Sequence, residues 1–216
     1  MKKLIVALLC CASFSQAKGF DVDKARELTV LVQNVGQGMG SGVLIDNTHV
    51  LTCFHMAKGP KDDFLIFLYP MGKVVEARVD TINPKDDLMI LTLSEPVPLT
   101  ETPVFENHVM IGEPITVVGN ALGVMTWFVS KGVVSAVRRG AILTDALVNP
   151  GNSGGPWFNE SGDIVAITSW RIGPNDEHNT PGYAGGIPGY AVNAFLDQWG
   201  AMKDQEAMIK ALRGIK

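Results

Sequence analysis

Residues 148–156 read VNPGNSGGP, and the next nine residues, 157–165, read WFNESGDIV. The first block places Ser153 in a run of Gly and Asn residues, which favour a tight turn with an unusual backbone. In α/β folds that present a serine on a Gly-x-Ser-x-Gly turn, a helix follows the serine directly. Here Pro156 and a hairpin-like segment follow instead. The stretch therefore favours a β-sheet protein, and it leaves open whether Ser153 is a nucleophile or an ordinary turn residue.

The rest of the chain also reads as short strands separated by turns. Strand-like runs lie at 28–35, 41–45, 50–52, 64–69, 74–82, 88–93, 115–119, 128–137, 141–145, 156–159, 164–170 and 189–192. Turn signals such as Asp-Asn, Asn-Pro and Arg-Gly separate these runs. No helix of 10–15 residues alternates with them, which counts against a parallel α/β sheet. Many short strands with Gly-rich turns predict an all-β barrel or sandwich.

A proline-rich passage, SEPVPLTETPVFENHVMIGEP at 94–114, divides the strands into two groups. We expect an N-terminal β unit at 22–105, opened by a short helix at 23–28, and a second β unit at 106–192. After that, apolar residues recur at steps of three and four, which predicts an amphipathic helix over 193–213. Asn193 is its expected N-cap and Gly200 a position where it could break. Residues 18–216 would then form one domain.

The first twenty residues, MKKLIVALLCCASFSQAKGF, combine two lysines, an apolar run at 4–14 and small residues near Ala17. This is the pattern of a cleavable secretory signal over 1–17, and the apolar run is too short to span a bilayer permanently. We therefore expect a secreted or periplasmic protein without a membrane anchor after cleavage. Cleavage would leave Cys53 as the only thiol, so we expect no internal disulfide and no cysteine metal cluster.

The composition excludes several kinds of partner. The 216 residues are 46% hydrophobic and 19% charged, with a formal net charge of −4. Such a chain offers no basic face for nucleic acid or for an acidic membrane. We expect no cofactor and no metal, and the sequence does not indicate an oligomeric state.

A serine hydroxyl is a weak nucleophile and needs a general base within hydrogen-bond reach. Three of the four histidines lie in an expected turn, linker or loop, namely His49, His108 and His178. His55 differs because it ends the apolar run HVLTCFH, where an imidazole could be fixed and partly desolvated. Asp87 directly precedes another apolar strand, so its carboxylate would require a partner. Its neighbour Asp86 lies one residue further from the strand and is expected to be solvated.

Three blocks of the sequence, GSGVLI…VLTCFH, DDLMIL and TDALVNPGNSGGP, resemble in this order the motif blocks of trypsin-like serine peptidases. The form is closest to HtrA-type peptidases, and GNALG, VSKGVVSAV, GDIVAITS and GYAVN extend the resemblance over roughly residues 30–200. It implies two perpendicular six-stranded antiparallel β-barrels with a site between them. It also implies His55 as general base, Asp87 as the group that orients it and Ser153 as nucleophile.

The resemblance further implies an oxyanion hole formed by the N–H groups of Gly151 and Ser153. A turn that aims two such groups at one oxygen needs a backbone that glycine adopts readily. The walls of the substrate pocket are expected at Leu147, Ser169, Trp170 and Arg171. With no acid at the base of the pocket, we expect cleavage after small or medium aliphatic residues rather than after Arg or Lys. Arg171 could narrow the pocket, favour an acidic residue or point into solvent.

Two features of the serine block separate it from related motifs. The Gly-x-Ser-x-Gly elbow of α/β-hydrolases needs the chain order serine, acid, histidine, but only His178 lies downstream of Ser153. Digestive trypsin-like enzymes carry an aspartate before the serine that pairs with a newly cut N-terminus, whereas this chain has Asn152. We therefore expect no zymogen switch of that kind.

The leading hypothesis is a secreted serine endopeptidase that acts on polypeptide substrates through an acyl-enzyme intermediate. The alternative is a catalytically silent homologue that binds peptides or serves as a scaffold. HtrA-type chains usually continue into a PDZ domain, whereas this sequence has Lys216 as its last residue. The resemblance therefore implies nothing about regulated assembly.

Overall fold

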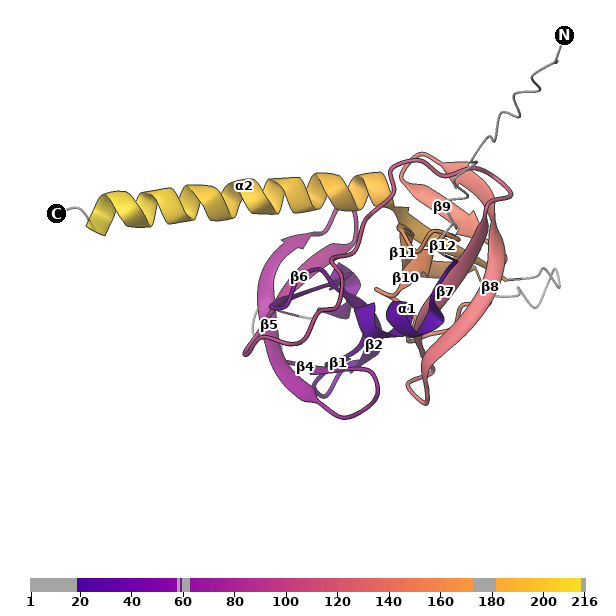
Figure 1. Cartoon of the computed structure of the whole chain (residues 1–216), viewed down its shortest axis with the longest axis horizontal. Coiled ribbons are helices and arrows are strands. Elements are labelled where there is room, and N and C mark those ends of the chain that lie inside the picture. Colours follow the sequence, from indigo (N-terminus) through magenta and orange to yellow (C-terminus); the bar gives the residue numbers. More distant parts are fainter. Residues whose placement is uncertain (1–18, 58, 60–62, 173–181, 215–216) are drawn as a thin grey trace, which may run out of the picture.

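The computed structural model describes residues 19–57, 59, 63–172 and 182–214, and the expected signal segment lies outside them. Its strands close into two antiparallel barrels of six strands each (Figure 1). The first barrel contains β1 (Thr29–Asn34), β2 (Gly38–Leu44), β3 (His49–Cys53), β4 (Phe64–Phe67), β5 (Val74–Asn83) and β6 (Leu88–Leu93). The second contains β7 (Pro114–Ala121), β8 (Met125–Arg138), β9 (Ala141–Thr144), β10 (Pro156–Phe158), β11 (Ile164–Ile172) and β12 (Tyr183–Pro188). The expected all-β fold of two six-stranded barrels is confirmed.

Alternation of side chains along the strands builds the interior of each barrel. In the first barrel, alternate residues such as Val30 and Val32 of β1 point inward and pack with Phe64 and Ile66 of β4. In the second barrel, the indole of Trp157 is fully buried in the corresponding cluster. Because side chains alternate between the two faces of a strand, the register of each strand pair decides which set is buried.

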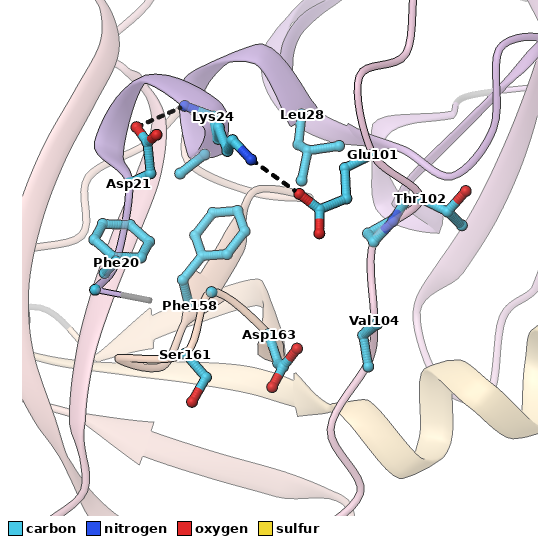
Figure 2. Close-up of a pocket in the computed structure, with 14 residues that line it drawn as sticks. Phe20, Asp21, Lys24, Leu28, Glu101, Thr102, Val104, Phe158, Ser161 and Asp163 are labelled. Atoms are coloured by element: carbon cyan, nitrogen blue, oxygen red, sulfur yellow. Dashed lines mark hydrogen bonds and ion pairs between the residues drawn. The ribbon is translucent and has the colours of Figure 1, made fainter. Parts of the chain in front are cut away.

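The two barrels share a third apolar cluster that contains residues of both and of two helices. Helix α1 (Val22–Leu28) contributes Ala25 and Leu28 to this cluster. Asp21 caps the helix by accepting hydrogen bonds from the backbone N–H groups of residues 23 and 24. Figure 2 shows α1 beside a small cavity, with Phe20 and Phe158 on one side and the ion pair of Lys24 with Glu101 above it. The segment before β1 thus bridges to the second barrel.

The expected strand at 189–192 is wrong, because these residues form the first turn of helix α2 (Gly189–Gly214). A short apolar run does not by itself distinguish a strand from a buried helix segment. The helix buries Val192 and Phe195, three residues apart, against the shared cluster. Gly189 allows the helix to begin against the backbone of Glu106, where a Cβ atom would collide with the carbonyl oxygen. The last strand of the second barrel is instead β12, at 183–188.

Two further expectations about this helix are also wrong. Asn193 is not its N-cap: it lies within the first turns, and its side chain donates hydrogen bonds to the Phe105 carbonyl and to the Asn107 side chain. Gly200 does not interrupt the helix. Figure 1 shows α2 leaving the second barrel, passing the first and extending beyond it. No helix in the described part of the chain combines the length and the apolar character needed to cross a membrane.

A carboxylate on β5 holds α2 against the first barrel. Asp80 accepts hydrogen bonds from Trp199 Nε1 at 3.1 Å, Lys203 Nζ at 2.7 Å and Thr92 Oγ1 at 2.8 Å. Burial would raise the pKa of Asp80, but these hydrogen bonds and the charge of Lys203 outweigh it, so the pKa lies below the usual value. The helix is therefore anchored by an ionised group as well as by apolar packing.

His49 also packs where Asp80 and Trp199 connect α2 to the first barrel. It is therefore not the solvated turn residue that its sequence context indicates. Its side chain is only 17% exposed, and its Nδ1 lies 2.8 Å from an oxygen of Asp46. The ring packs edge-on against the indole of Trp199 with 4.7 Å between centroids. Since Trp199 is 150 residues later in the chain, local sequence could not reveal this partner.

We expect Asp80→Ala to lower the free energy of unfolding by about 2 kcal/mol, because several hydrogen bonds to a charged group are lost and their donors stay half-buried. Urea denaturation would measure the loss, and amide hydrogen exchange should show faster exchange in α2. Asp204→Ala, at an exposed position of the same helix, is the control and should change neither. Equal exchange of α2 in the Asp80 variant and the wild type would show that the anchor is unimportant.

Candidate active site

His55 and Asp87 are brought together by the pairing of β3 with β6. Cys53 of β3 lies opposite Leu88 of β6, so the residues just beyond this pair meet at the end of the barrel. His55 lies on the short 3-10 helix η1 (Phe54–Met56) that follows β3. The backbone N–H of Phe54 donates to the carbonyl of Asp87 at 3.0 Å, which continues the ladder up to His55 and Asp87.

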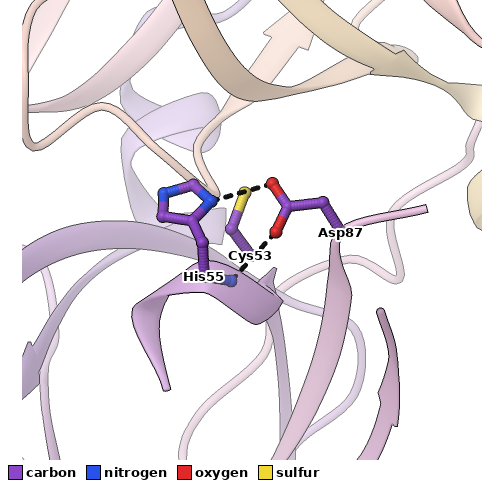
Figure 3. A group of neighbouring side chains, drawn as sticks. All are labelled: Cys53, His55 and Asp87. Atoms are coloured by element: carbon purple, nitrogen blue, oxygen red, sulfur yellow. Dashed lines mark hydrogen bonds and ion pairs between the residues drawn. The ribbon is translucent and has the colours of Figure 1, made fainter. Parts of the chain in front are cut away.

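The carboxylate of Asp87 forms hydrogen bonds with both the ring and the backbone N–H of His55 (Figure 3). Its Oδ2 lies 2.8 Å from His55 Nδ1, and its Oδ1 accepts the His55 backbone N–H at 2.9 Å. Ser169 of β11 in the second barrel donates its hydroxyl to Oδ2 at 2.5 Å. Asp87 therefore orients the imidazole with Nδ1 inward, which leaves Nε2 as the ring nitrogen that can accept a proton from a reacting group.

The environment keeps Asp87 ionised although its side chain is only 26% exposed. Burial would raise its pKa, but the hydrogen bonds from His55 and Ser169 outweigh this effect and lower the pKa below its usual value. Asp87 also has a φ of 55°, in the left-handed region that non-glycine residues rarely adopt. Such a conformation costs about 1–3 kcal/mol and persists where surrounding contacts impose it, as they do at functional sites.

The lowered pKa of Asp87 should make the folded protein sensitive to acid. The ionised group stabilises the folded state at neutral pH, and this contribution is lost as the pH falls from the unfolded value of 3.8 through the lower folded value. We expect the free energy of unfolding, measured in urea between about pH 5 and pH 3, to fall more steeply for the wild type than for Asp87→Asn. Parallel curves for the two proteins would contradict the assignment.

Cys53 lies beneath this pair and is fully buried. Its Sγ donates to the Thr168 carbonyl at 3.1 Å, and ligand-type atoms of Cys53, His55 and Asp87 lie within 4.8 Å of one another. Burial raises the pKa of the thiol well above its usual value, and the negative charge of Asp87 adds to the shift. Since metal ligands and nucleophiles are thiolates, Cys53 is suited to packing rather than to either role.

Ser153 reaches the same end of the first barrel from the turn that precedes β10. Its carbonyl accepts the N–H of Ser41 at 2.8 Å, and Gly40 next to it faces both that carbonyl and the Met56 side chain. Gly154 lies so close to β2 and β3 that a Cβ atom there would collide with the Ser41 carbonyl and the Thr52 hydroxyl. The structure thus places the backbone of Ser153 beside the segment that carries His55.

Among the described residues, no hydrogen bond joins the Ser153 hydroxyl to His55. Contacts of this kind are often long in a free protein and shorten only when a substrate is bound. Ser153 is half-buried, so part of the residue remains exposed to solvent.

Among the described residues, the turn at 149–153 has two backbone N–H groups for which there is no acceptor. The N–H of Asn152 donates to the Asn149 carbonyl and that of Gly154 to the Thr168 carbonyl. Within the part of the chain that the structure describes, the N–H groups of Gly151 and Ser153 donate to no acceptor. Gly151 has a φ of 98°, which explains why this position requires glycine. Two unused donors on one turn are what an oxyanion hole needs.

Asn152 is 1% exposed, and neither polar atom of its side chain has a hydrogen-bond partner among the described residues. The side chain lies against Gly119 of the second barrel. The described N-terminal residues, from Gly19 onward, lie instead beside Phe158. The absence of an activation switch at Asn152 stays a prediction.

The four expected pocket residues do not line one cavity. Leu147 and Arg171 line a cavity of about 190 Å³ together with Tyr183 and Ala184. Ser169 instead bonds Asp87, and the indole of Trp170 lies against Gly185 on β12, at an irregularity in the β11–β12 register. Their roles in substrate binding stay predictions.

Two contacts of the site do not follow from the sequence pattern. The pattern places Ser169 in a wall of the pocket and not beside Asp87, and it includes Ser41 in the GSGVLI block without indicating a role for it. Ser41 and Ser169 bond Gly151 and Asp87, which lie 110 and 82 residues away in the sequence. A local sequence pattern cannot reveal a partner so far away in the chain. The only local feature of these two serines is that each lies in a strand, beside a glycine or a tryptophan.

A model of the family described as "Trypsin-like peptidase domain" matches residues 40–167. Over 185 residues the chain is 29% identical to "Protease Do-like 1, chloroplastic" of Arabidopsis thaliana, covering 79% of this chain and 41% of that protein. Over 174 residues it is 31% identical to a "Probable periplasmic serine endoprotease DegP-like" of Brucella suis biovar 1, covering 76% and 33%. The chain thus spans about two fifths or less of the length of these relatives.

The matched range contains His55, Asp87 and Ser153, and it runs from the first barrel into β11 of the second. It extends over more than half of the chain, and the architecture of two six-stranded barrels agrees with it. This protein therefore belongs to the family of trypsin-like peptidase domains.

Proposed function

We propose that this protein is a serine endopeptidase in which His55, Asp87 and Ser153 form a catalytic triad. The observation that carries the proposal is the set of hydrogen bonds around the Asp87 carboxylate. The carboxylate bonds both the ring and the backbone N–H of His55, and it accepts the hydroxyl of Ser169 from the other barrel. A carboxylate whose backbone is held in a strained conformation, and which is bonded across the junction of two barrels, is difficult to explain by packing alone.

In the proposed reaction, Ser153 Oγ attacks the carbonyl carbon of a peptide bond while His55 Nε2 takes its proton. Asp87 stabilises the imidazolium that results and keeps Nδ1 as the protonated nitrogen. The N–H groups of Gly151 and Ser153 would stabilise the oxyanion of the tetrahedral intermediate. His55 then protonates the leaving amine, and a water molecule activated by the same imidazole releases the acyl group from Ser153.

We further propose that the substrates are polypeptides cleaved after small or medium aliphatic residues. Support comes from the cavity of Leu147 and Arg171, whose lining includes the apolar side chains of Ala146 and Val148. Asp145 and Arg171 also line this cavity, so it contains an acid that the sequence pattern does not predict. A peptide library cleaved by the protein would reveal this preference.

A secreted or periplasmic location is also proposed. It rests on the Lys-Lys start and the apolar run of residues 1–17, which lie outside the described residues. The name of the relative from Brucella suis contains the word "periplasmic". Mass spectrometry of the exported protein would locate the cleavage after Ala17.

A fluorophosphonate probe tests the catalytic proposal against the alternative of a silent peptide-binding homologue. The probe forms a covalent bond with an activated serine, so the wild type should be labelled at Ser153 and Ser153→Ala should not. Ser161→Ala, at an exposed serine of the same barrel, is the control and should be labelled like the wild type. A folded wild type that resists the probe would favour the silent homologue.

A further inference from the structure

A buried hydroxyl lies behind the turn that carries the proposed oxyanion hole. Ser41 of β2 is 0% exposed, and its Oγ donates to the Gly151 carbonyl at 2.8 Å. The same oxygen accepts the backbone N–H of Asn120 at 2.9 Å and its side-chain Nδ2 at 3.1 Å. A serine hydroxyl has one donor and two acceptor positions. All of them are used, so the hydroxyl proton is directed at Gly151.

Asn120 is itself fixed from several strands. It is 0% exposed, its Nδ2 also donates to the Val30 carbonyl at 3.0 Å, and its Oδ1 accepts the backbone N–H of Trp127 at 3.0 Å. Asn120 lies where the register between β7 and β8 shifts, opposite the start of β8. The carboxamide therefore links Ser41 to strands of both barrels. Both its Nδ2 and its Oδ1 are hydrogen-bonded, which fixes its orientation.

The two peptide groups around Gly151 are each held by their carbonyl oxygen. The Pro150 carbonyl accepts the N–H of Leu122 at 2.6 Å, and the Gly151 carbonyl accepts the Ser41 hydroxyl. In a planar trans peptide the N–H points opposite to the C=O. The hydrogen bond to the Pro150 oxygen therefore sets the direction of the Gly151 N–H. The hydrogen bond to the Gly151 oxygen fixes the next peptide group, so the two groups cannot rotate together away from this arrangement.

The backbone of the β7–β8 hairpin supports this interpretation. Among the described non-glycine residues, positive φ occurs at Asp87, Leu122 and Trp127, and two of these three lie in this hairpin. Leu122 donates to Pro150, and Trp127 donates to Asn120. The unfavourable conformations thus coincide with the donors that hold the turn, as strain at a functional site would.

We propose that Ser41, held by Asn120, is a positioning residue. By bonding the Gly151 carbonyl it fixes the peptide group between Gly151 and Asn152, and this keeps the Gly151 N–H in the direction required for an oxyanion hole. The inference rests on the proposed function and adds a residue that touches neither substrate nor the reacting atoms. Gly151 itself can adopt many conformations, so the turn depends on a group outside it to hold a single one.

The test compares Ser41→Ala and Ser41→Cys with the control Thr29→Val. Thr29 is 0% exposed, and its hydroxyl donates to the Ala25 carbonyl of α1 at 2.7 Å, so the control removes a buried hydroxyl that is not bonded to Gly151, and it leaves the Thr29 carbonyl that accepts the Trp127 indole N–H. Cysteine keeps the shape of serine with a weak S–H donor. Steady-state cleavage of a fluorogenic peptide and inhibition by a peptide boronate would be measured for each variant.

We expect Ser41→Ala to lower kcat at least tenfold with KM changed less than twofold, and to weaken boronate binding by a similar factor. Ser41→Cys should be intermediate, and it preserves the test if the alanine variant does not fold. Thr29→Val should stay within twofold of the wild type. A raised KM at unchanged kcat, a normal kcat in the cysteine variant, or an equal loss in Thr29→Val would each overturn the proposal.

A second measurement separates this proposal from the proposed function. Amide hydrogen exchange of Asn152 reports the turn directly, because its N–H donates to the Asn149 carbonyl within it. Exchange should accelerate in Ser41→Ala and not in Thr29→Val, whether or not the protein cleaves peptides. An inactive wild type would refute the proposed function alone, whereas unchanged exchange of Asn152 would refute the role of Ser41.

Discussion

Replacing Ser153 by alanine is expected to reduce kcat for peptide hydrolysis by about 10⁶-fold, because the proposed nucleophile is removed. His55→Ala should cost about as much, since without a base the serine hydroxyl does not become a nucleophile at neutral pH. The double variant should be no slower than either single one, because both residues act in the same step. Turnover of a fluorogenic peptide at known protein concentration would measure all three variants.

The matched control for this series is His108→Ala, which alters an exposed histidine in the segment between the barrels. It should retain wild-type turnover. Thermal unfolding of Ser153→Ala should stay close to that of the wild type, because Ser153 makes no side-chain hydrogen bond among the described residues, whereas His55→Ala also loses the Nδ1 hydrogen bond to Asp87. Losses that add up in the double variant would show that the two residues do not act together.

Asp87→Asn is expected to lower kcat by about 10⁴-fold while KM changes little. The substitution keeps the shape of the side chain and suits the φ of 55° at this position. It replaces an acceptor of the His55 Nδ1 proton by a group that can also donate. The imidazole could then carry its proton on Nε2, where it could no longer accept the proton of Ser153.

The control for Asp87→Asn is the neighbouring Asp86→Asn. Asp86 accepts a hydrogen bond from the Asn83 side chain at 2.9 Å and makes no described contact with His55. Its variant should keep turnover within about twofold of the wild type. If both asparagine variants lost activity equally, the loss would report damage to the β5–β6 turn rather than a role of Asp87 in catalysis.

Much of the fold could be predicted because the burial of a strand is visible in the apolar pattern of its own consecutive residues. Runs such as 88–93 carry their apolar character in consecutive residues, and the structure has β6 at the same bounds. The error at 189–192 arose where this signal is weakest, in a four-residue apolar run that suits a helix equally well. The correct strand, 183–188, follows residues outside the described part of the chain and contains two consecutive glycines, which weaken a strand pattern.

The candidate site could be predicted only in part. His55 and Asp87 each adjoin an apolar strand, and the structure confirms that these two side chains meet. His49 shows the limit of the same reasoning, because its context indicates a solvated turn whereas the ring packs against Trp199. A residue whose partner lies on a distant helix has no local feature that distinguishes it from an exposed one.

The sequence by itself determined the β character of the chain, its division by the proline-rich passage, and the order of histidine, aspartate and serine. Only the tertiary structure decided that Ser169 bonds Asp87, that Ser41 and Asn120 hold Gly151, and that Asp80 anchors α2. Side-chain periodicity specifies which face of a strand is buried, but not which distant residue lies opposite it. That choice is made when two closed barrels and a helix pack together, because register and closure then fix contacts between segments many residues apart.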